Sequence, residues 1–134
     1  MQRDREYLLD ILEAAKLALE YVGDKTREEF FNDLQCQDAV IRRLEIIGEA
    51  ARRISEETRA AFPDMPWSDM IGMRNVIIHE YDDVDFFIVW ETIHNDLPKL
   101  IDSLEKIVAA KKKSLFGTMT KTEMFDIRDD QDRI

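Results

Sequence analysis

Apolar residues recur at helical spacing along most of this chain. In the first segment, from Asp4 to Val22, they fall at i, i+3 and i+4 positions of one helical face: Leu8, Ile11, Leu12, Ala15 and Leu19. The 134 residues include only 4 glycines and 3 prolines, so the chain has few of the turns that many short strands require. We therefore predict an all-α fold, an up-and-down bundle of four to five helices.

Capping residues divide this helical pattern into segments. Gly23 follows the last periodic residue of the first segment, a position where glycine commonly ends a helix. Thr26 and Glu29 have the spacing of a capping box, which begins a second segment that continues to about Ile54. This segment is either one long helix or a short helix followed by a long one, with the break at Asn32-Asp33.

Two more helices are expected in the middle of the chain. Ser55 has the features of an N-cap, and the short helix that follows it ends at Phe62-Pro63. Either Ser68 or Asp69 is the expected cap of a further helix, which runs to about Glu80. The loop between these two helices is the clearest one in the sequence.

A last helical stretch covers about residues 84 to 112. Pro98 must kink or restart it, because proline lacks the backbone donor and its ring clashes with the preceding turn. From Ser114 onward the helical period is lost. We predict one helical domain over residues 1–113 and, over residues 114–134, a tail that is either mobile or ordered by a partner.

The composition limits the compartment and the chemistry. Cys36 is the single cysteine, so no internal disulfide forms and a reducing cytoplasm is the natural location. No apolar signal core precedes the first helix, and the longest apolar run, from Phe86 to Trp90, is far below the ~20 residues that span a bilayer. Neither a metal-ligand spacing nor a glycine-rich phosphate loop occurs, so we expect no cofactor and no membrane association.

The formal net charge of −10 argues against broad, sequence-independent binding of nucleic acid. Such binding requires a basic face that neutralises phosphates. Any contact with nucleic acid therefore has to depend on a local concentration of positive charge.

The segment from Gly72 to Tyr81 contains the densest group of polar residues in an otherwise apolar stretch. Arg74, Asn75, His79 and Tyr81 interrupt it. Burying such groups without partners costs several kcal/mol, so they form either a structural network or a functional site. Both interpretations are open at this point.

The residue types in this segment suit cleavage of RNA without a metal. Histidine can act as acid or base near neutral pH, which the 2′-hydroxyl and the leaving oxygen require. Arginine is always charged and offers a planar fork that matches two phosphate oxygens. Arg74 and His79 supply both functions five residues apart.

Helical geometry complicates a site built from one chain. A separation of five residues rotates the direction by about 140°, so Arg74 and His79 do not share a face of a straight helix. Asn75 shares a face with His79, and Tyr81 shares one with Arg74. A single site that contains both residues therefore needs one of three arrangements. The Arg74 side chain reaches around the helix, the helix ends near His79, or a second protomer contributes residues. A two-fold homodimer joined along this helix would supply two histidines and two arginines to one cleft.

The order Arg74-x4-His79-x-Tyr81 resembles the Arg-x4-His-x-Tyr motif of the HepT toxins in the HEPN superfamily. The segment from Pro66 to Tyr81 is similar to the core of that family, and so are residues 44–51 upstream and residues 89–93 and 96–98 downstream. The similarity covers roughly residues 4 to 110, in order. These flanking blocks make it far more specific than the short motif.

The resemblance implies a helical homodimer with the motif in a cleft between protomers. It implies metal-independent endoribonuclease activity on RNA, with Arg74 and His79 as the catalytic pair, and we assign supporting roles to Asn75 and Tyr81. It also implies a partner, the minimal nucleotidyltransferase MntA, which neutralises the toxin by transferring AMP from ATP to the motif tyrosine, here Tyr81. The chain would then be the toxin of a type VII-like toxin–antitoxin pair. An anionic nucleotide beside Arg74 and His79 would block the cleft and repel RNA phosphate.

A second interpretation is a non-catalytic HEPN module that docks a nucleotidyltransferase and presents Tyr81 as its acceptor. The low net charge favours this binding module, whereas the intact pair of Arg74 and His79 favours the nuclease. If the protein were only a structural helical bundle, the whole polar segment would be a coincidence.

Other charged residues have simpler explanations. Arg42, Arg43, Arg52 and Arg53 are candidates to add positive charge at the cleft, although a solvated helix face explains them more simply. Glu45 and Glu49, one turn apart, either balance Arg74 inside the bundle or face solvent.

The remaining histidine and the two tryptophans are assigned outside the catalytic group. His94 is expected at the surface or as a cap, because Asn95 and Asp96 follow it. Trp67 and Trp90 are expected as anchors of the core or of the dimer interface.

Overall fold

The computed structural model describes the backbone of residues 3–79 and 84–115, and the side chains of residues 3–73 and 84–109. The described chain is helical, with turns between the helices and no strand, which confirms the all-α prediction. The helices are α1 (Asp4–Val22), α2 (Arg27–Phe31), α3 (Leu34–Arg53), α4 (Glu56–Ala61), α5 (Trp67–His79), α6 (Phe86–Glu91), the π-helix η2 (Thr92–Asp96) and α7 (Leu97–Leu115). Of the predicted tail, residues 114–134, the first two residues belong to α7, and the rest lies outside the described residues.

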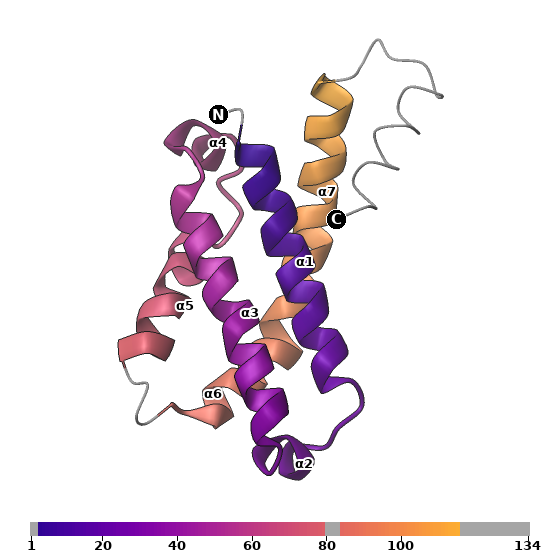
Figure 1. The fold of residues 1–134 in the computed structure, drawn as a ribbon. Coiled ribbons are helices and arrows are strands. Elements are labelled where there is room, and N and C mark those ends of the chain that lie inside the picture. The colour runs from indigo at the N-terminus through magenta and orange to yellow at the C-terminus, as the bar shows by residue number, and fades with distance from the viewer. Residues whose placement is uncertain (1–2, 80–83, 116–134) are drawn as a thin grey trace.

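The long helices alternate in direction along the bundle (Figure 1). Helix α1 packs against both α3 and α7, and α5 packs against α3. The short helices α2 and α6 lie at one end of the bundle, and α4 lies at the other. Helix α5 is therefore an outer helix whose described packing partner is α3.

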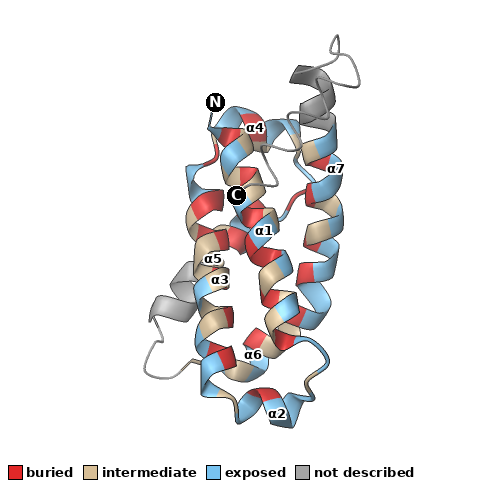
Figure 2. Ribbon diagram, turned by 45° about the vertical axis from the view of Figure 1, so that its right-hand side comes forward, coloured by how far each residue is buried: buried red, intermediate tan, exposed pale blue. Residues whose placement is uncertain are grey.

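The core follows the helical period that the sequence shows. Buried residues form one stripe on α1 and one on α3, so the two helices meet along apolar faces (Figure 2). The stripe residues are Leu8, Ile11, Ala15, Ala18 and Val22 on α1, and Val40, Leu44, Ile47 and Ala51 on α3. Gly48 and Ala50 on α3 are also buried, and their small size lets a neighbouring helix approach closely.

The first corner of the bundle has the predicted caps. Gly23 follows α1 with φ of +54°, in the left-handed region that favours glycine. Thr26 and Glu29 form the capping box: the Glu29 N–H donates to Thr26 Oγ1 at 3.1 Å, and the Thr26 N–H donates to Glu29 Oε1 at 2.9 Å. The break at Asn32-Asp33 separates the short helix α2 from the long helix α3, which settles the alternative left open by the pattern.

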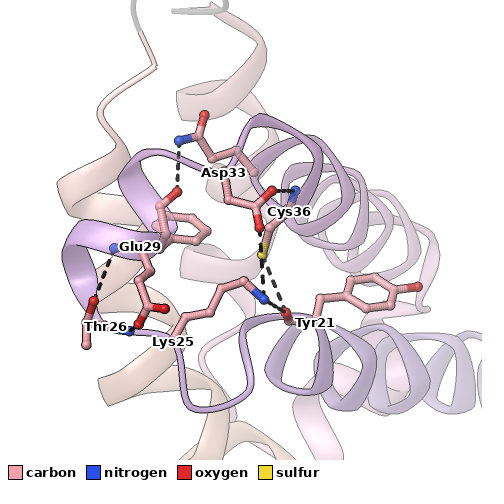
Figure 3. A network of polar contacts seen from close by, with 8 residues as sticks. Tyr21, Lys25, Thr26, Glu29, Asp33 and Cys36 are labelled. Carbon is pink, nitrogen blue, oxygen red and sulfur yellow. Dashed lines mark hydrogen bonds and ion pairs between the residues drawn. The ribbon is translucent and has the colours of Figure 1, made fainter.

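A polar network fixes the turn from α1 through α2 to α3 (Figure 3). The Cys36 backbone N–H donates to Asp33 Oδ1 at 3.0 Å, which caps α3. The Cys36 thiol and the Lys25 ammonium both donate to the Tyr21 carbonyl, at 3.5 and 3.4 Å. From α3, the buried amide of Gln37 donates to the carbonyls of residues 30 and 31, so α2 is held where it ends.

The structure corrects the start of α5. Ser68 and Asp69 are not its caps, because the helix already begins at Trp67. The Met70 N–H donates to the Pro66 carbonyl at 3.0 Å, so Pro66 occupies the position before the first helical residue. The Trp67 indole donates to the Phe62 carbonyl at 2.9 Å, which anchors this start to the end of α4. The cap of α4, in contrast, is Ser55 as predicted, since its hydroxyl accepts from the Thr58 N–H.

Pro98 restarts the last helical stretch. It is the second residue of α7, and the turn before it is the π-helix η2, in which the Leu97 N–H donates to the Thr92 carbonyl five residues back. Such a widened turn changes the helical register just before the residue that cannot donate. The apolar run of residues 86–90 therefore belongs to a separate short helix, α6, which Asp85 caps through the N–H groups of Phe87 and Ile88.

Candidate active site

Helix α5 carries three of the four predicted site residues. Arg74, Asn75 and His79 all lie within it, whereas Tyr81 lies outside the described residues. For Arg74, Asn75 and His79 the structure describes the backbone alone, so their places follow from the register of the helix. The backbone is α-helical through His79, so Arg74 and His79 belong to one continuous helix.

The register of α5 places these positions on two faces. Met70 is 1% exposed and lies on the face packed against the core. Arg74 follows Met70 by four residues, so its position continues that inner face within about 40°. His79 follows Gly72 by seven residues, so its position lies within about 20° of Gly72 around the helix axis. The Asn75 position lies on the same face of the helix. Within one chain, the arginine and histidine positions therefore lie on different faces of α5, as their spacing predicted.

A groove runs along the Gly72 side of α5. It has a volume of about 1050 Å³ and lies between α5 and α6, with one residue each from α2 and α3 and two from η2. Its described lining is mostly apolar, including Phe31, Leu44, Met73, Val84, Phe86, Phe87, Ile88 and Val89, and from α5 it also includes Ser68, Asp69 and Gly72. A Cβ built on Gly72 would meet no atom within 4 Å, so the backbone of α5 is open to the groove. The histidine position thus lies on the helix face that borders this groove.

The charged residues in the described lining of the groove are all acidic. Asp69, Asp85 and Asp96 line it, and no lysine or arginine does so among the described residues. Asp85 is engaged as the cap of α6, with its Oδ1 accepting from the Phe87 N–H at 3.0 Å. The described part of this groove therefore presents negative rather than positive charge to a ligand.

Three arginines of α3 pair with glutamates of the same helix. Arg42 pairs with Glu45 at 3.5 Å, and Arg52 and Arg53 both pair with Glu49, at 3.3 and 3.2 Å. These pairs are half exposed, which agrees with a solvated helix face. Arg43 is partly buried. Whether either glutamate balances Arg74 depends on a side chain outside the described residues.

His94 and both tryptophans take the structural roles that were predicted for them. His94 is exposed on η2, its ring stacks on Trp90 at a centroid distance of 3.9 Å, and its Nδ1 lies 3.0 Å from the Trp90 carbonyl oxygen. Trp90 also contacts the buried Phe30, with ring centroids 5.6 Å apart. Trp67 is part of the core. None of the three lines the groove.

The described residues contain no group of three or more His, Cys, Asp or Glu side chains placed to hold a metal ion. In the same part of the chain, no helix is both long and apolar enough to cross a membrane.

Sequence reasoning did not identify the groove. The helical stretch predicted over about residues 84 to 112 includes Phe87 and Ile88, which are 48% and 50% exposed. A usable signal was present, because five successive apolar residues, 86–90, cannot all face one side of a helix. Such a run predicts that some of its members remain exposed or meet a partner.

Comparison with known proteins gives consistent matches. The profile of the family described as "Ribonuclease HepT-like" matches residues 11–107. A Thermococcus cleftensis protein named "Probable ribonuclease HepT" is 41% identical over 103 residues, which are 77% of this chain and 94% of the relative. A Methanocaldococcus jannaschii protein named "Putative RNase MJ1380" is 42% identical over 101 residues, 75% of this chain and 93% of the relative. No solved structure gives a significant match.

The helical fold and these matches together define a protein of the HEPN superfamily. More specifically, the chain belongs to the HepT-like ribonuclease family. The resemblance seen in the sequence is therefore confirmed at the level of the family.

Proposed function

We propose that this protein is a metal-independent endoribonuclease, the cytoplasmic toxin of a type VII-like toxin–antitoxin pair. The observation that carries the proposal is the place of His79 within α5, on the face that borders the groove, in a chain of the HepT-like ribonuclease family. The names of the relatives support an RNA substrate.

The chemistry assigned to the motif is transesterification at phosphorus. The ribose 2′-oxygen attacks the adjacent phosphorus as one histidine takes the hydroxyl proton, and the bond to the 5′-oxygen breaks as a protonated histidine supplies a proton to that oxygen. The products are a 2′,3′-cyclic phosphate and a free 5′-hydroxyl. Arg74 stabilises the negative charge that develops on the phosphorane oxygens. Asn75 and Tyr81 support the site.

The need for a separate general acid and general base favours a homodimer. Each chain has two histidines, and the second, His94, stacks on Trp90 away from the groove. A base and an acid that act in the same step therefore need His79 from two chains. The opposed faces of Arg74 and His79 on α5 lead to the same conclusion, because the arginine of one protomer can then serve beside the histidine of the other.

A partner enzyme controls this activity by modifying Tyr81. A MntA-type nucleotidyltransferase transfers AMP from ATP to the Tyr81 phenol, with pyrophosphate as the leaving group. The added phosphate places a negative charge next to the catalytic pair, where it competes with the phosphate of RNA.

A second function is a non-catalytic module that docks the nucleotidyltransferase and serves as its acceptor. The net charge of −10 and the three aspartates along the groove favour it.

RNA cleavage in EDTA separates the two functions. The experiment compares unmodified wild type with His79→Ala and with His94→Ala, the matched control at the other histidine. We expect wild type and His94→Ala to cleave labelled RNA, and His79→Ala to be at least ~100-fold slower, the usual loss for a general acid or base. Equal cleavage by His79→Ala, or cleavage only after Mg²⁺ is added, contradicts the proposal. No cleavage by any of the three, with Tyr81 unmodified by mass spectrometry, supports the docking module.

A further inference from the structure

The corner where α2 meets α3 exposes apolar side chains. Leu34, the first residue of α3, is 74% exposed, and Phe31, the last residue of α2, is 39% exposed. Leu34 lines a hollow of about 670 Å³ whose other lining residues are all polar: Lys25, Glu28, Glu29, Asn32 and Asp33. An apolar group rimmed by polar residues is typical of a surface that binds another protein. We call Leu34 and the other residues that line this hollow the α2/α3 corner.

The chain around the α2/α3 corner is strongly acidic. Residues 20–38 include six acidic and two basic residues, which leaves a formal charge of −4. Both basic residues are already paired, because Lys25 lies 4.0 Å from Asp33 and Arg27 lies 3.7 Å from Glu91. The remaining charge is negative, so this surface attracts a basic protein and repels the phosphates of nucleic acid.

Local hydrogen bonds hold the α2/α3 corner in one shape (Figure 3). Thr26 and Glu29 close the capping box of α2, and Asp33 caps α3. The buried Gln37 amide donates to the carbonyls of residues 30 and 31, at 3.0 and 2.9 Å. A surface that is fixed before binding loses little conformational entropy when a partner docks on it. The corner is therefore a preformed surface.

Phe31 connects the corner with the segment of the chain that carries Tyr81. Phe31 and Val84 line the same groove. Tyr81 lies outside the described residues, but it precedes Val84 by three residues, which span at most about 10 Å. In Figure 1, α5 runs toward the end of the bundle where α2 and α6 lie. An enzyme that reaches Tyr81 therefore meets this end of the bundle.

We propose that the α2/α3 corner is the docking surface for the nucleotidyltransferase that modifies Tyr81, with Leu34 seated in an apolar recess of that enzyme and basic residues of the enzyme facing the acidic ones around it. The inference rests on the proposed function in one respect, since the modification of Tyr81 belongs to that proposal. Complementary charges speed the encounter of two proteins, and a buried apolar contact slows their dissociation. Docking at the corner leaves the catalytic pair out of the contact.

Isothermal titration calorimetry of the full chain with a purified MntA-type nucleotidyltransferase tests this surface. The background is Tyr81→Phe, which prevents transfer during the titration. In it, Leu34→Ser/Glu28→Lys (the corner variant) should weaken binding about tenfold or more, because it removes the apolar contact and sets like charges opposite one another. Gln35→Ser/Glu13→Lys is the matched control, since both residues are exposed and neither lines the hollow. Equal binding by the corner variant and this control overturns the inference.

Steady-state AMP transfer to chains that keep Tyr81 gives a second readout. We expect the corner variant to raise KM for the acceptor protein about tenfold or more at an unchanged kcat, because the Tyr81 phenol itself is unaltered. Added salt should raise KM more steeply for wild type than for the corner variant, whose surface carries less negative charge. A lower kcat at an unchanged KM, or the same salt dependence for both chains, contradicts docking at the corner.

The same samples separate this inference from the proposed function. Binding that depends on the corner, without any label on Tyr81, removes the AMP transfer and keeps the docking surface. Labelling of Tyr81 with the same KM in wild type and the corner variant keeps the transfer and removes the docking surface. If Leu34→Ser loses self-association and still binds the enzyme like wild type, a second copy of the chain occupies the corner and the inference is wrong.

Discussion

Asp4 and Ser55 connect the first residue of α1 to the cap of α4. The Asp4 carboxylate accepts the Ser55 N–H at 3.1 Å and the Ser55 hydroxyl at 2.6 Å, and it also accepts the Thr58 hydroxyl at 2.5 Å. Asp4 is 2% exposed, and its three hydrogen bonds satisfy a charge that would otherwise be costly to bury. The start of the bundle therefore depends on one carboxylate.

Replacing Asp4 by Ala should destabilise the protein by about 2–3 kcal/mol, because it leaves the donors of Ser55 and Thr58 without their acceptor. Urea unfolding measures the change, and Asp64→Ala, at an exposed position in the loop before α5, is the control. A loss no larger than that of the control would show that water replaces the carboxylate without cost.

The same carboxylate should make stability depend on pH. Burial raises the pKa of Asp4, but hydrogen bonds from Ser55 and Thr58 outweigh it, so the pKa lies below the ordinary value. A carboxyl with a lower pKa in the folded chain contributes stability that is present above the unfolded pKa and lost as pH falls through the folded pKa. We expect Tm to fall below about pH 4 more steeply for wild type than for Asp4→Asn. Parallel curves of Tm against pH would remove this role.

Two glycines should respond in opposite ways to substitution by Ala. Gly72 is helical with open space around a new Cβ, so Gly72→Ala should stabilise the chain by about 0.5–1 kcal/mol. Gly23 has φ of +54°, so Gly23→Ala should destabilise it by about 1–2 kcal/mol. Denaturant unfolding of both variants, at a concentration where the chain is monomeric, checks the contrast. A destabilised Gly72→Ala monomer would mean that the open space beside α5 is filled within the protomer.

Replacing Tyr81 by Phe should abolish labelling by ATP that carries its radioactive label in the AMP part, in the presence of a MntA-type nucleotidyltransferase. The ring of the variant lacks the oxygen that forms the new bond to phosphorus. Tyr21→Phe is the matched control and should be labelled like wild type. Undiminished labelling of Tyr81→Phe places the acceptor at another residue.

The helices and most of their boundaries could be predicted because their determinants are local. Thr26 and Glu29 lie within one turn of each other, and both halves of their capping box form. The error at the start of α5 has the opposite cause. Pro66 takes the capping position because the Trp67 indole is held by the carbonyl of Phe62, a tertiary contact that no spacing of polar residues reports.

The candidate site could be predicted only in part. The motif positions and their separation on two faces follow from the sequence, and the register of α5 agrees with that expectation. The groove does not follow from the sequence, because it depends on where α6 lies relative to α5 in the folded chain. The exposure of Phe87 and Ile88 likewise depends on the break in register at η2.

The π-helix η2 determines which way α6 faces. Removing one residue from Thr92–Asp96 would convert the widened turn into an ordinary α-helical one and rotate α6 by about 100° relative to α7. Phe87 and Ile88 would then point away from the groove while the core residues of α7 stayed in place. A deletion or insertion of one residue at this point would therefore change the surface beside α5 while the rest of the bundle kept its packing.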